Sequence, residues 1–351
     1  ADMAGNLGIW NLTLVRDDAG WPHCVVRNGS QHQLEYCTWD GSQWTHSHIM
    51  RDALIGRSNV ILCDSSNDLS IVSVDEERPF NNDAETVHRL NFYQQSTSTW
   101  QQETLLEIQG TTSLGGTIAF DAAMDENDDP VFAVKTQSGT DEYYFCYFDG
   151  SDFVMEPVFS HDPVNPNEVT LALAPDQTPW IAFVHVAESM KQLRVAHPSG
   201  TSWEIDTLCE ANFISENSLT AGPDNLPGIV YVSDEPGYRQ CYLATYTGSS
   251  WSIDVPYPHP CHFPKLVFDD ANTPHIVLAN DDVNGLIYVT HDGQDWITET
   301  ITETPDCVHY LKNLVADSQG NLHIVYGLSE AGEFHDHSLM YGTRVSGQWY
   351  T

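Results

Sequence analysis

Basic residues, long apolar segments and helical periodicity are scarce in this sequence. Its 351 residues include 13 lysines and arginines against 50 aspartates and glutamates, a formal charge of −37. Binding to phosphates depends on lysine and arginine, so we expect no nucleic-acid partner. The apolar runs are five to eight residues long, far below the roughly 20 needed to cross a bilayer, so membrane insertion is not expected either. The acidic, Gly-, Pro- and Trp-rich composition is typical of an extracellular or periplasmic protein.

What the sequence does contain is one pattern repeated seven times. Each copy has an apolar run, a turn rich in Asp, Asn and Gly, two further apolar runs, and a closing aromatic residue in a Gly-x-x-Trp-like motif. The closing residues lie 45 to 56 positions apart and are Trp44, Trp100, Phe153, Trp203, Trp251, Trp296 and Trp349. This period is typical of a four-stranded β-propeller blade.

The residues before each closing aromatic support the same register. Seven positions earlier stand mostly small residues such as Cys37, Ala196 and Ala244, and three positions before those stand mostly leucines such as Leu34 and Leu193. Side chains on one strand alternate between its two faces. These two aligned positions, called below the small column and the leucine column, therefore indicate the third strand of each blade.

The repeats predict an all-β fold, a single seven-bladed β-propeller domain with four-stranded antiparallel blades. The chain is expected to be a monomer. The predicted blades span residues 12–50, 58–108, 117–160, 169–208, 217–256, 264–303 and 312–351. We expect the termini to meet in the last blade, with residues 1–11 closing it and Leu7 to Trp10 completing or flanking its sheet, because a propeller leaves no long unpaired edge.

The pattern Asp-x-x-Gly-x-Pro-His-Ile, Leu-x-Tyr-Ala and Gly-x-x-Trp is seen in its fullest form in Asp269 to Val277 and Leu286 to Trp296. It resembles the repeats of bacterial secreted seven-bladed β-propellers. Lectins and polysaccharide lyases occur among propellers of similar design. The resemblance implies the architecture, and a fold supports many functions, so the ligand has to be argued from a site.

Most of the eight cysteines occupy aligned repeat positions whose side chains are expected to pack in the core. Cys37 and Cys146 occupy the small column of the third strand, which predicts buried thiols. Cys24 and Cys37 face a common core and are one possible bridge. Cys261 and Cys307, which precede the innermost strands of adjacent blades, are the better disulfide candidate, although sequence does not fix connectivity.

Function in propellers concentrates in loops at the mouth of the central channel. Aligning the seven copies on the Pro-His-Ile turn brings one residue per blade to an equivalent position before the innermost strand, and two glutamates follow one position later. These predicted ligand-binding residues are Trp10, Arg57, Asn167, Ser215, His262 and Tyr310, with Glu168 and Glu216. The third blade has an uncertain register and is assigned no residue.

Three functions fit these residues. The first is a binding protein for a sugar or similar small-molecule ligand, with Trp10 and Tyr310 stacking on it and polar groups bonding its hydroxyls. The second is a glycan-cleaving enzyme, so whether the protein is an enzyme stays open. The third is a protein-interaction scaffold. Binding is preferred because no catalytic motif stands out.

The enzyme hypothesis has two forms. In a polysaccharide lyase, His262, His309 or Tyr310 would move protons and Arg57 would neutralise a uronate. In a glycosidase, Glu168 and Glu216 would form the carboxylate pair. The acidic composition argues against a polyanionic substrate unless a local basic pocket overrides it.

Histidines offer weaker signals for a metal. His259, His262 and His309 lie in adjacent connectors and could hold zinc, but their spacing matches no standard pattern. The Asp-rich turns lack the ligand order of a calcium loop and fit turn chemistry better. No cofactor is therefore required by the prediction. His23, His275 and His323 recur at one position after the turn, which predicts a structural role in bonding to it.

Overall fold

The structure, a computed structural model, describes residues 9–28, 33–39, 42–51, 55–77, 86–96, 99–110, 118–137, 140–150, 152–161, 169–187, 190–234, 237, 239–280, 282, 284–304, 307–330 and 338–351. All regular elements within these ranges are β-strands. None of the described segments forms a helix that is long and apolar enough to span a membrane. The chain divides into two compact units, residues 7–169 and residues 170–351 with residues 1–6.

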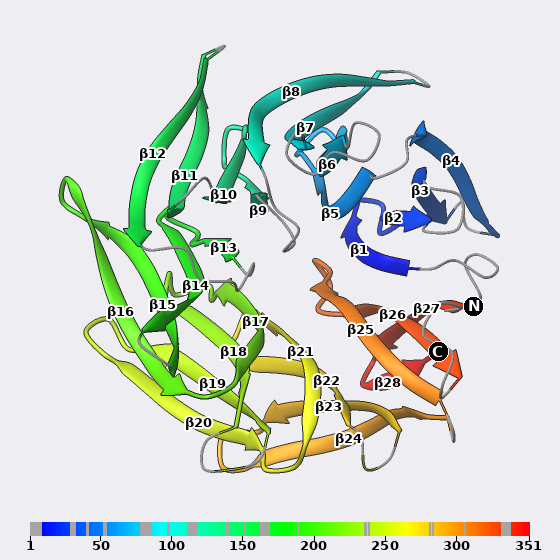
Figure 1. Cartoon of the computed structure of the whole chain (residues 1–351). Helices are drawn as coiled ribbons and strands as arrows, with labels where there is room; N and C mark the ends of the chain where they lie inside the picture. The colour runs from blue at the N-terminus through cyan, green and yellow to red at the C-terminus, as the bar shows by residue number, and fades with distance from the viewer. Residues whose placement is uncertain are drawn as a thin grey trace. The chain divides into compact units, whose positions relative to one another are not determined.

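Three four-stranded antiparallel sheets make up the first unit (Figure 1). The first sheet contains β1 (Ile9–Arg16), β2 (Pro22–Asn28), β3 (Gln33–Trp39) and β4 (Trp44–Arg51). The second contains β5 (Ile55–Cys63), β6 (Leu69–Glu77), β7 (Thr86–Ser96) and β8 (Thr99–Gly110). The third contains β9 (Ile118–Met124), β10 (Pro130–Gln137), β11 (Asp141–Asp149) and β12 (Asp152–His161).

Four further sheets of the same kind follow. Their strands are β13 (Val169–Leu173), β14 (Pro179–Ala187), β15 (Met190–Ser199), β16 (Ser202–Ala211), β17 (Ile214–Ala221), β18 (Pro227–Ser233), β19 (Gln240–Tyr246), β20 (Trp251–Tyr257), β21 (Cys261–Phe268), β22 (Pro274–Asn280), β23 (Gly285–His291), β24 (Trp296–Glu303), β25 (Cys307–Ala316), β26 (Leu322–Glu330), β27 (Ser338–Val345) and β28 (Gln348–Tyr350). In every sheet the strands are hydrogen-bonded in chain order. The predicted class, an all-β fold of seven four-stranded antiparallel blades, is confirmed.

The two ends of the chain pair differently from the expectation. Ile9 pairs with Asn28, so Ile9 and Trp10 belong to β1 of the first blade rather than to the last one. The last blade has its own fourth strand, β28, which pairs with β27. The reason is that the first blade's innermost strand begins earlier than the repeat alignment indicated, with a bulge between Ile9 and Leu12. Residues 1–8 lie outside the described part.

The core confirms the third-strand columns. Residues of the leucine column, such as Leu34, Leu193 and Leu286, are fully buried, and so are Ala196 and Ala244 of the small column. Apolar side chains of adjacent blades pack into shared clusters within each unit. Of the cysteines that the repeat places in packing positions, Cys24, Cys37, Cys146 and Cys241 are buried as free thiols, whereas Cys63 is free but only partly buried. Cys24 and Cys37 lie directly opposite each other on β2 and β3.

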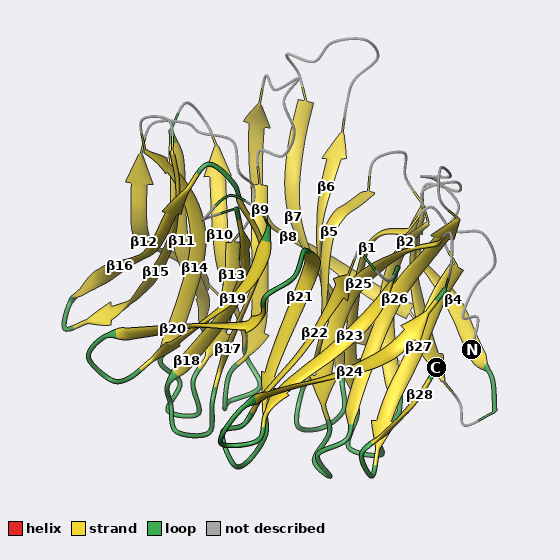
Figure 2. Cartoon of the chain, turned by 90° about the horizontal axis from the view of Figure 1, so that it is seen from below, coloured by secondary structure: helices red, strands yellow, loops and turns green. Residues whose placement is uncertain are grey.

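A tight turn joins the first and second strands of each blade. In all seven turns a residue donates its N–H to the carbonyl four positions on, and the fourth turn residue has a positive φ. Those left-handed residues are Gly20, Asn67, Asp128, Gln177, Asn225, Asn272 and Gly320. Glycine, asparagine and aspartate tolerate this conformation best. The requirement explains the Asp, Asn and Gly content of the repeat; Figure 2 shows the β21–β22 and β25–β26 turns at the lower edge of their blades.

The recurrent histidines bind these turns, as predicted. His323 places Nδ1 2.5 Å from the Tyr341 hydroxyl and Nε2 3.3 Å from the Asp317 carboxylate. His23 and His275 make the same two contacts in their blades, with a tyrosine and with the first aspartate of the turn. Each histidine therefore ties a turn to the third strand of its own blade.

Gly228 occupies this histidine position in the fifth blade. A Cβ atom built there would lie 2.6 Å from Cζ of Phe268 in the next blade. The position therefore has to lack a side chain for Phe268 to pack against β18.

Candidate functional site

Among the pairings that the structure describes, several innermost strands depart from regular register, four of them within their first five residues and β25 at its middle. β17 has a bulge between Ser215 and Ser218, β21 between His262 and Lys265, and β25 between Leu311 and Asn313. β1 and β5 have bulges at comparable positions. A bulge rotates side chains away from the regular alternation of a strand and is common beside functional sites. The predicted ligand-binding position thus coincides with a recurrent break in the sheet register.

The predicted residues fall into three groups. Trp10, Arg57, Glu216 and His309 lie in β1, β5, β17 and β25, and only their backbone is described. Asn167 and Glu168 lie outside the described residues. Ser215, His262 and Tyr310 are described with their side chains, and all three belong to the unit formed by residues 170–351. The channel-mouth site as a whole stays a prediction.

Phe263 connects two of the predicted residues. Its ring centroid lies 5.9 Å from that of His262 and 5.5 Å from that of Tyr310, across the interface between β21 and β25. Phe263 has a φ of 53°. This left-handed conformation is unusual for an aromatic residue, and such strain tends to occur where the surrounding structure fixes a side chain for a purpose. The bulge of β21 therefore presents an aromatic side chain to the neighbouring blade.

Two lysines complete this group. Lys312 lies in the bulge of β25, and its Nζ is 5.7 Å from the centroid of the Tyr310 ring, a cation–π distance. Burial, followed by the positive charge of Lys265, lowers the pKa of Lys312 to about 8. We call His262, Phe263, Lys265, Tyr310 and Lys312 the bulge cluster. Sequence analysis identified His262 and Tyr310 but missed the lysines, although the scarcity of lysine was a usable signal.

The preceding blade carries a different arrangement at the start of β17. The Lys191 ammonium donates a hydrogen bond to the Ile214 carbonyl at 3.3 Å, and Arg239 lies 4.0 Å above the Phe213 ring. The Phe213 N–H donates to the Asp234 carboxylate. Here the cation of Lys191 is bound to the backbone and supports the start of the strand.

The disulfide and metal predictions concern the same connectors. Cys261 is buried with a free thiol and packs in one cluster with Cys241 of the preceding blade. The Cys307 side chain lies outside the described part, but because the Cys261 thiol is free, the predicted bridge from Cys261 is not formed. His259 packs against the Tyr257 ring. Among the side chains that the structure describes, no three His, Cys, Asp or Glu residues are grouped to hold a metal ion.

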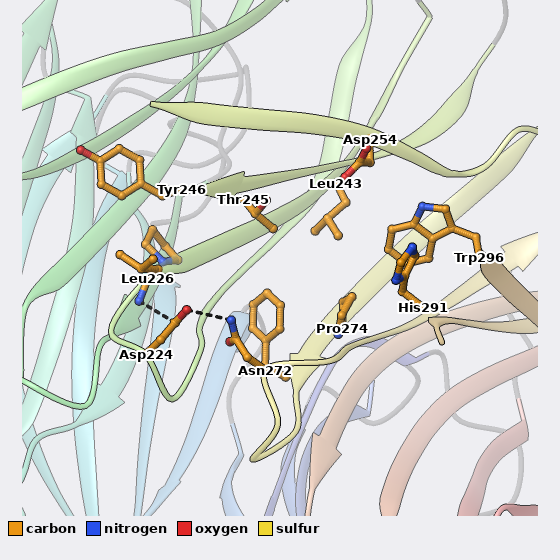
Figure 3. Close-up of a pocket in the computed structure, with 12 residues that line it drawn as sticks. Asp224, Leu226, Leu243, Thr245, Tyr246, Asp254, Asn272, Pro274, His291 and Trp296 are labelled. Atoms are coloured by element: carbon orange, nitrogen blue, oxygen red, sulfur yellow. Dashed lines mark hydrogen bonds between the residues drawn. The ribbon is translucent and has the colours of Figure 1, made fainter. Parts of the chain in front are cut away.

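A cavity of about 300 Å³ lies between the β17–β20 and β21–β24 blades. Its lining includes His291 and Trp296, whose rings meet edge to face at 5.1 Å, and the carboxylates of Asp224 and Asp254. Asp224 accepts a hydrogen bond of 2.7 Å from the Asn272 amide (Figure 3). The pocket lies at the turn end of the blades, away from the predicted position, and its acidic lining suits a neutral or cationic ligand. The sequence analysis did not predict this pocket; of its lining residues, it had singled out only Trp296, as the closing aromatic residue of a repeat.

Comparison with known proteins gives structural matches alone. No protein-family model matches the chain, and no curated protein matches its sequence. Among solved structures, it is similar to an ulvan lyase, a polysaccharide lyase solved with GlcA(1-4)Rha3S, at a TM-score of 0.63 and 11% identity over 98% of this chain and 97% of that one. The polysaccharide lyase Uly1 is similar at 0.58 and 8% identity, covering 98% and 90%.

A fucose-bound lectin is also similar. The lectin of Aleuria aurantia, solved with Fucα1-6GlcNAc, matches at a TM-score of 0.50 and 14% identity over 86% of this chain and 99% of that one. At such low identities these matches show a shared fold only.

Proposed function

We propose that this protein binds a glycan through the bulge cluster, in an extracellular or periplasmic setting. The observation that supports the proposal most directly is the pair of aromatic rings, Phe263 and Tyr310, whose centroids lie 5.5 Å apart on the adjacent innermost strands β21 and β25. Aromatic faces stack on the apolar face of a sugar, and the polar groups of His262 and Lys312 lie next to them. The glycan-binding and glycan-cleaving structures of similar fold make a sugar ligand the first to test.

The test compares Tyr310→Ala with Trp296→Ala, which removes an aromatic side chain from the acidic pocket at the turn end. Binding to a panel of immobilised oligosaccharides is measured for both variants, and thermal unfolding confirms that they fold. We expect Tyr310→Ala to weaken binding about tenfold, corresponding to roughly 1.4 kcal/mol for one stacking aromatic residue. Trp296→Ala should bind like the parent protein.

Two results would overturn the proposal. If Trp296→Ala loses binding and Tyr310→Ala keeps it, the sugar site is the acidic pocket. If no oligosaccharide binds the parent protein, the scaffold hypothesis gains instead.

A second candidate function is cleavage by a polysaccharide lyase. It is favoured by the position of Tyr310, which lies next to the Lys312 ammonium and one aromatic ring away from His262. In β-elimination a base removes the C5 proton of a uronate while a cation offsets the carboxylate charge. The C4–O bond then breaks, its oxygen takes up a proton, and a C4=C5 double bond forms.

That reaction has a direct assay. Incubation with uronate-containing polysaccharides should release an unsaturated product that absorbs in the ultraviolet, and Tyr310→Phe should reduce its rate. Binding without any absorbing product would reject the lyase and retain the binding protein. The glycosidase form, which rests on Glu168 and Glu216, stays a prediction.

A further inference from the structure

The four lysines of this chain differ in what their ammonium groups contact. Lys135 is fully buried, and its ammonium lies 3.1 Å from the carboxylate of Asp141. Lys191 is bound to a backbone carbonyl. The remaining two, Lys265 and Lys312, lie on β21 and β25, which pack against each other, and the charge of Lys265 contributes to lowering the pKa of Lys312. In a chain with 50 acidic residues and 13 basic ones, two lysines on packed neighbouring strands are unexpected.

The bulges account for this placement. Lys265 is the first paired residue after the bulge of β21 and lies opposite Val277. Lys312 is the extra residue of the bulge in β25, between Leu311, which pairs with Tyr326, and Asn313, which pairs with Val325. β21 packs against β25, so the two irregular segments are neighbours. Each lysine therefore lies at or directly beside the irregular point of its strand.

Lys312 has no anion nearby among the described residues. Burial and Lys265 are the two influences on its pKa, both of which disfavour the charged form, and no carboxylate of the described chain opposes them. Like charges at close range repel, and a partly buried ammonium without a counterion is costly. An anion bound beside Lys312 would offset both influences on this ammonium group, because it would supply the opposite charge that burial and Lys265 make favourable.

We propose that Lys265 and Lys312 form a subsite for the anionic group, a carboxylate or a sulfate, of an acidic sugar whose ring stacks on Tyr310 and Phe263. This inference rests on the proposed glycan-binding function and specifies the class of ligand. It also resolves the conflict between the acidic composition and a polyanionic ligand, because the opposing cations are concentrated at one position. Both binding and cleavage of an acidic glycan would use the same subsite.

The experiment measures the affinity of the parent protein for three probes by calorimetry. The probes are an oligogalacturonate, its carboxyl-reduced neutral counterpart, and a sulfated galactan oligosaccharide of similar length. We expect one or both acidic probes to bind at least tenfold more tightly than the neutral one, with an affinity that falls as salt rises. The two acidic arms distinguish a carboxylate subsite from a sulfate subsite.

Variants assign the effect to the lysines. Lys312→Met and Lys265→Met should each lower affinity for the preferred acidic probe about tenfold, the usual scale for a charge-assisted hydrogen bond. Lys312→Arg should retain most of it. The matched control is Lys191→Met, which also removes one positive charge from this unit and should change affinity less than twofold. Thermal unfolding shows that each variant folds.

The outcomes distinguish a failure of the glycan-binding function from a failure of the anion subsite. If no probe binds and the oligosaccharide panel is also negative, the glycan-binding function fails. If the neutral probe binds as tightly as the acidic ones, or if both Met variants keep the parent affinity, the glycan-binding function stands and the anion subsite is wrong. Equal losses in Lys191→Met and Lys312→Met would also overturn it, because the effect would then be general charge.

Discussion

The two ends of the blades in residues 170–351 differ in how closely they follow the repeat. At the turn end, the blades share one backbone hydrogen-bond pattern, and adjacent turns are connected, as in the hydrogen bond from the Asn272 amide to Asp224. Toward the opposite end, β17 and β21 have a bulge near their first residues and β25 has one at its middle, and different side chains lie beside these bulges. The difference teaches that residues repeated in every blade meet structural requirements, whereas residues that depart from the repeat are the ones we propose for ligand binding.

The largest expected effect tests the structural end. Asp317 accepts hydrogen bonds from the backbone N–H groups of Gln319 and Asn321 at 2.8 Å each, from the Asn321 amide, and it contacts His323. Asp317→Ala should lower the free energy of unfolding by about 1–3 kcal/mol, because three donors of the turn, two of them partly buried, lose their acceptor. Urea unfolding measures the loss.

The matched change at the other end is Lys312→Met, which should leave the free energy of unfolding unchanged or raise it, since it removes a half-buried ammonium. Glycan affinity should show the reverse order, with Asp317→Ala near the parent value. If Lys312→Met is the more destabilising of the two, the division of the blade into a structural and a ligand-binding end is wrong.

An intermediate effect is expected from acid. Burial lowers the pKa of His23 and His275 below the ordinary value of 6.5, and their aspartate partners oppose this only in part. Both histidines are therefore neutral in the folded state at a pH at which the unfolded chain binds protons. Their contribution to stability is complete above pH 6.5 and is lost as the pH falls below it. Urea unfolding at pH 7.5, 6.5 and 5.5 should show the decline.

The variant His275→Gln identifies the source of that decline. It removes one of the titrating groups, so the loss of stability between pH 7.5 and 5.5 should be smaller than in the parent protein. An identical decline in the variant would assign the acid sensitivity to other groups.

The smallest effect concerns the ligand-binding end at alkaline pH. Burial, then Lys265, lowers the pKa of Lys312 to about 8, and the described groups beside it are Lys265, Tyr310 and, through Phe263, His262. Lys312 therefore loses its charge between pH 7 and 9. Affinity for an acidic sugar should fall severalfold over this range, as calorimetry can measure. Lys312→Arg should abolish this pH dependence, because arginine stays protonated. If the affinity of the variant still falls between pH 7 and 9 as it does in the parent protein, Lys312 is not the titrating group.

The sequence was sufficient for features that each blade determines locally. The turn needs a left-handed residue, the third strand needs leucine and small side chains on its buried face, and His275 needs its turn aspartate, so these appear at a fixed spacing in many copies. The number of blades and their strand order were predictable for that reason. The start of β1 was not, because the bulge after Ile9 shifts the first blade relative to the aligned copies.

The proposed ligand-binding end was predictable only in part. The aligned position includes His262 and Tyr310 of the bulge cluster; His262 directly precedes a bulge, and Tyr310 lies one residue before the start of another. It did not identify Lys265 and Lys312, which lie at different distances from the turn of their blades. Their proximity depends on where each bulge inserts its extra residue and on the packing of β21 against β25, and neither is encoded in the spacing of one repeat.

The absence of a side chain at Gly228 has a consequence for the evolution and engineering of this chain. Phe268 occupies the space that a Cβ atom at Gly228 would need. Moving a blade with His23 or Trp180 at that position into the fifth place would drive a large group into the phenyl ring. The blades share a sequence pattern but are not freely exchangeable at this position, and placing another blade there would require compensating substitutions in its neighbour.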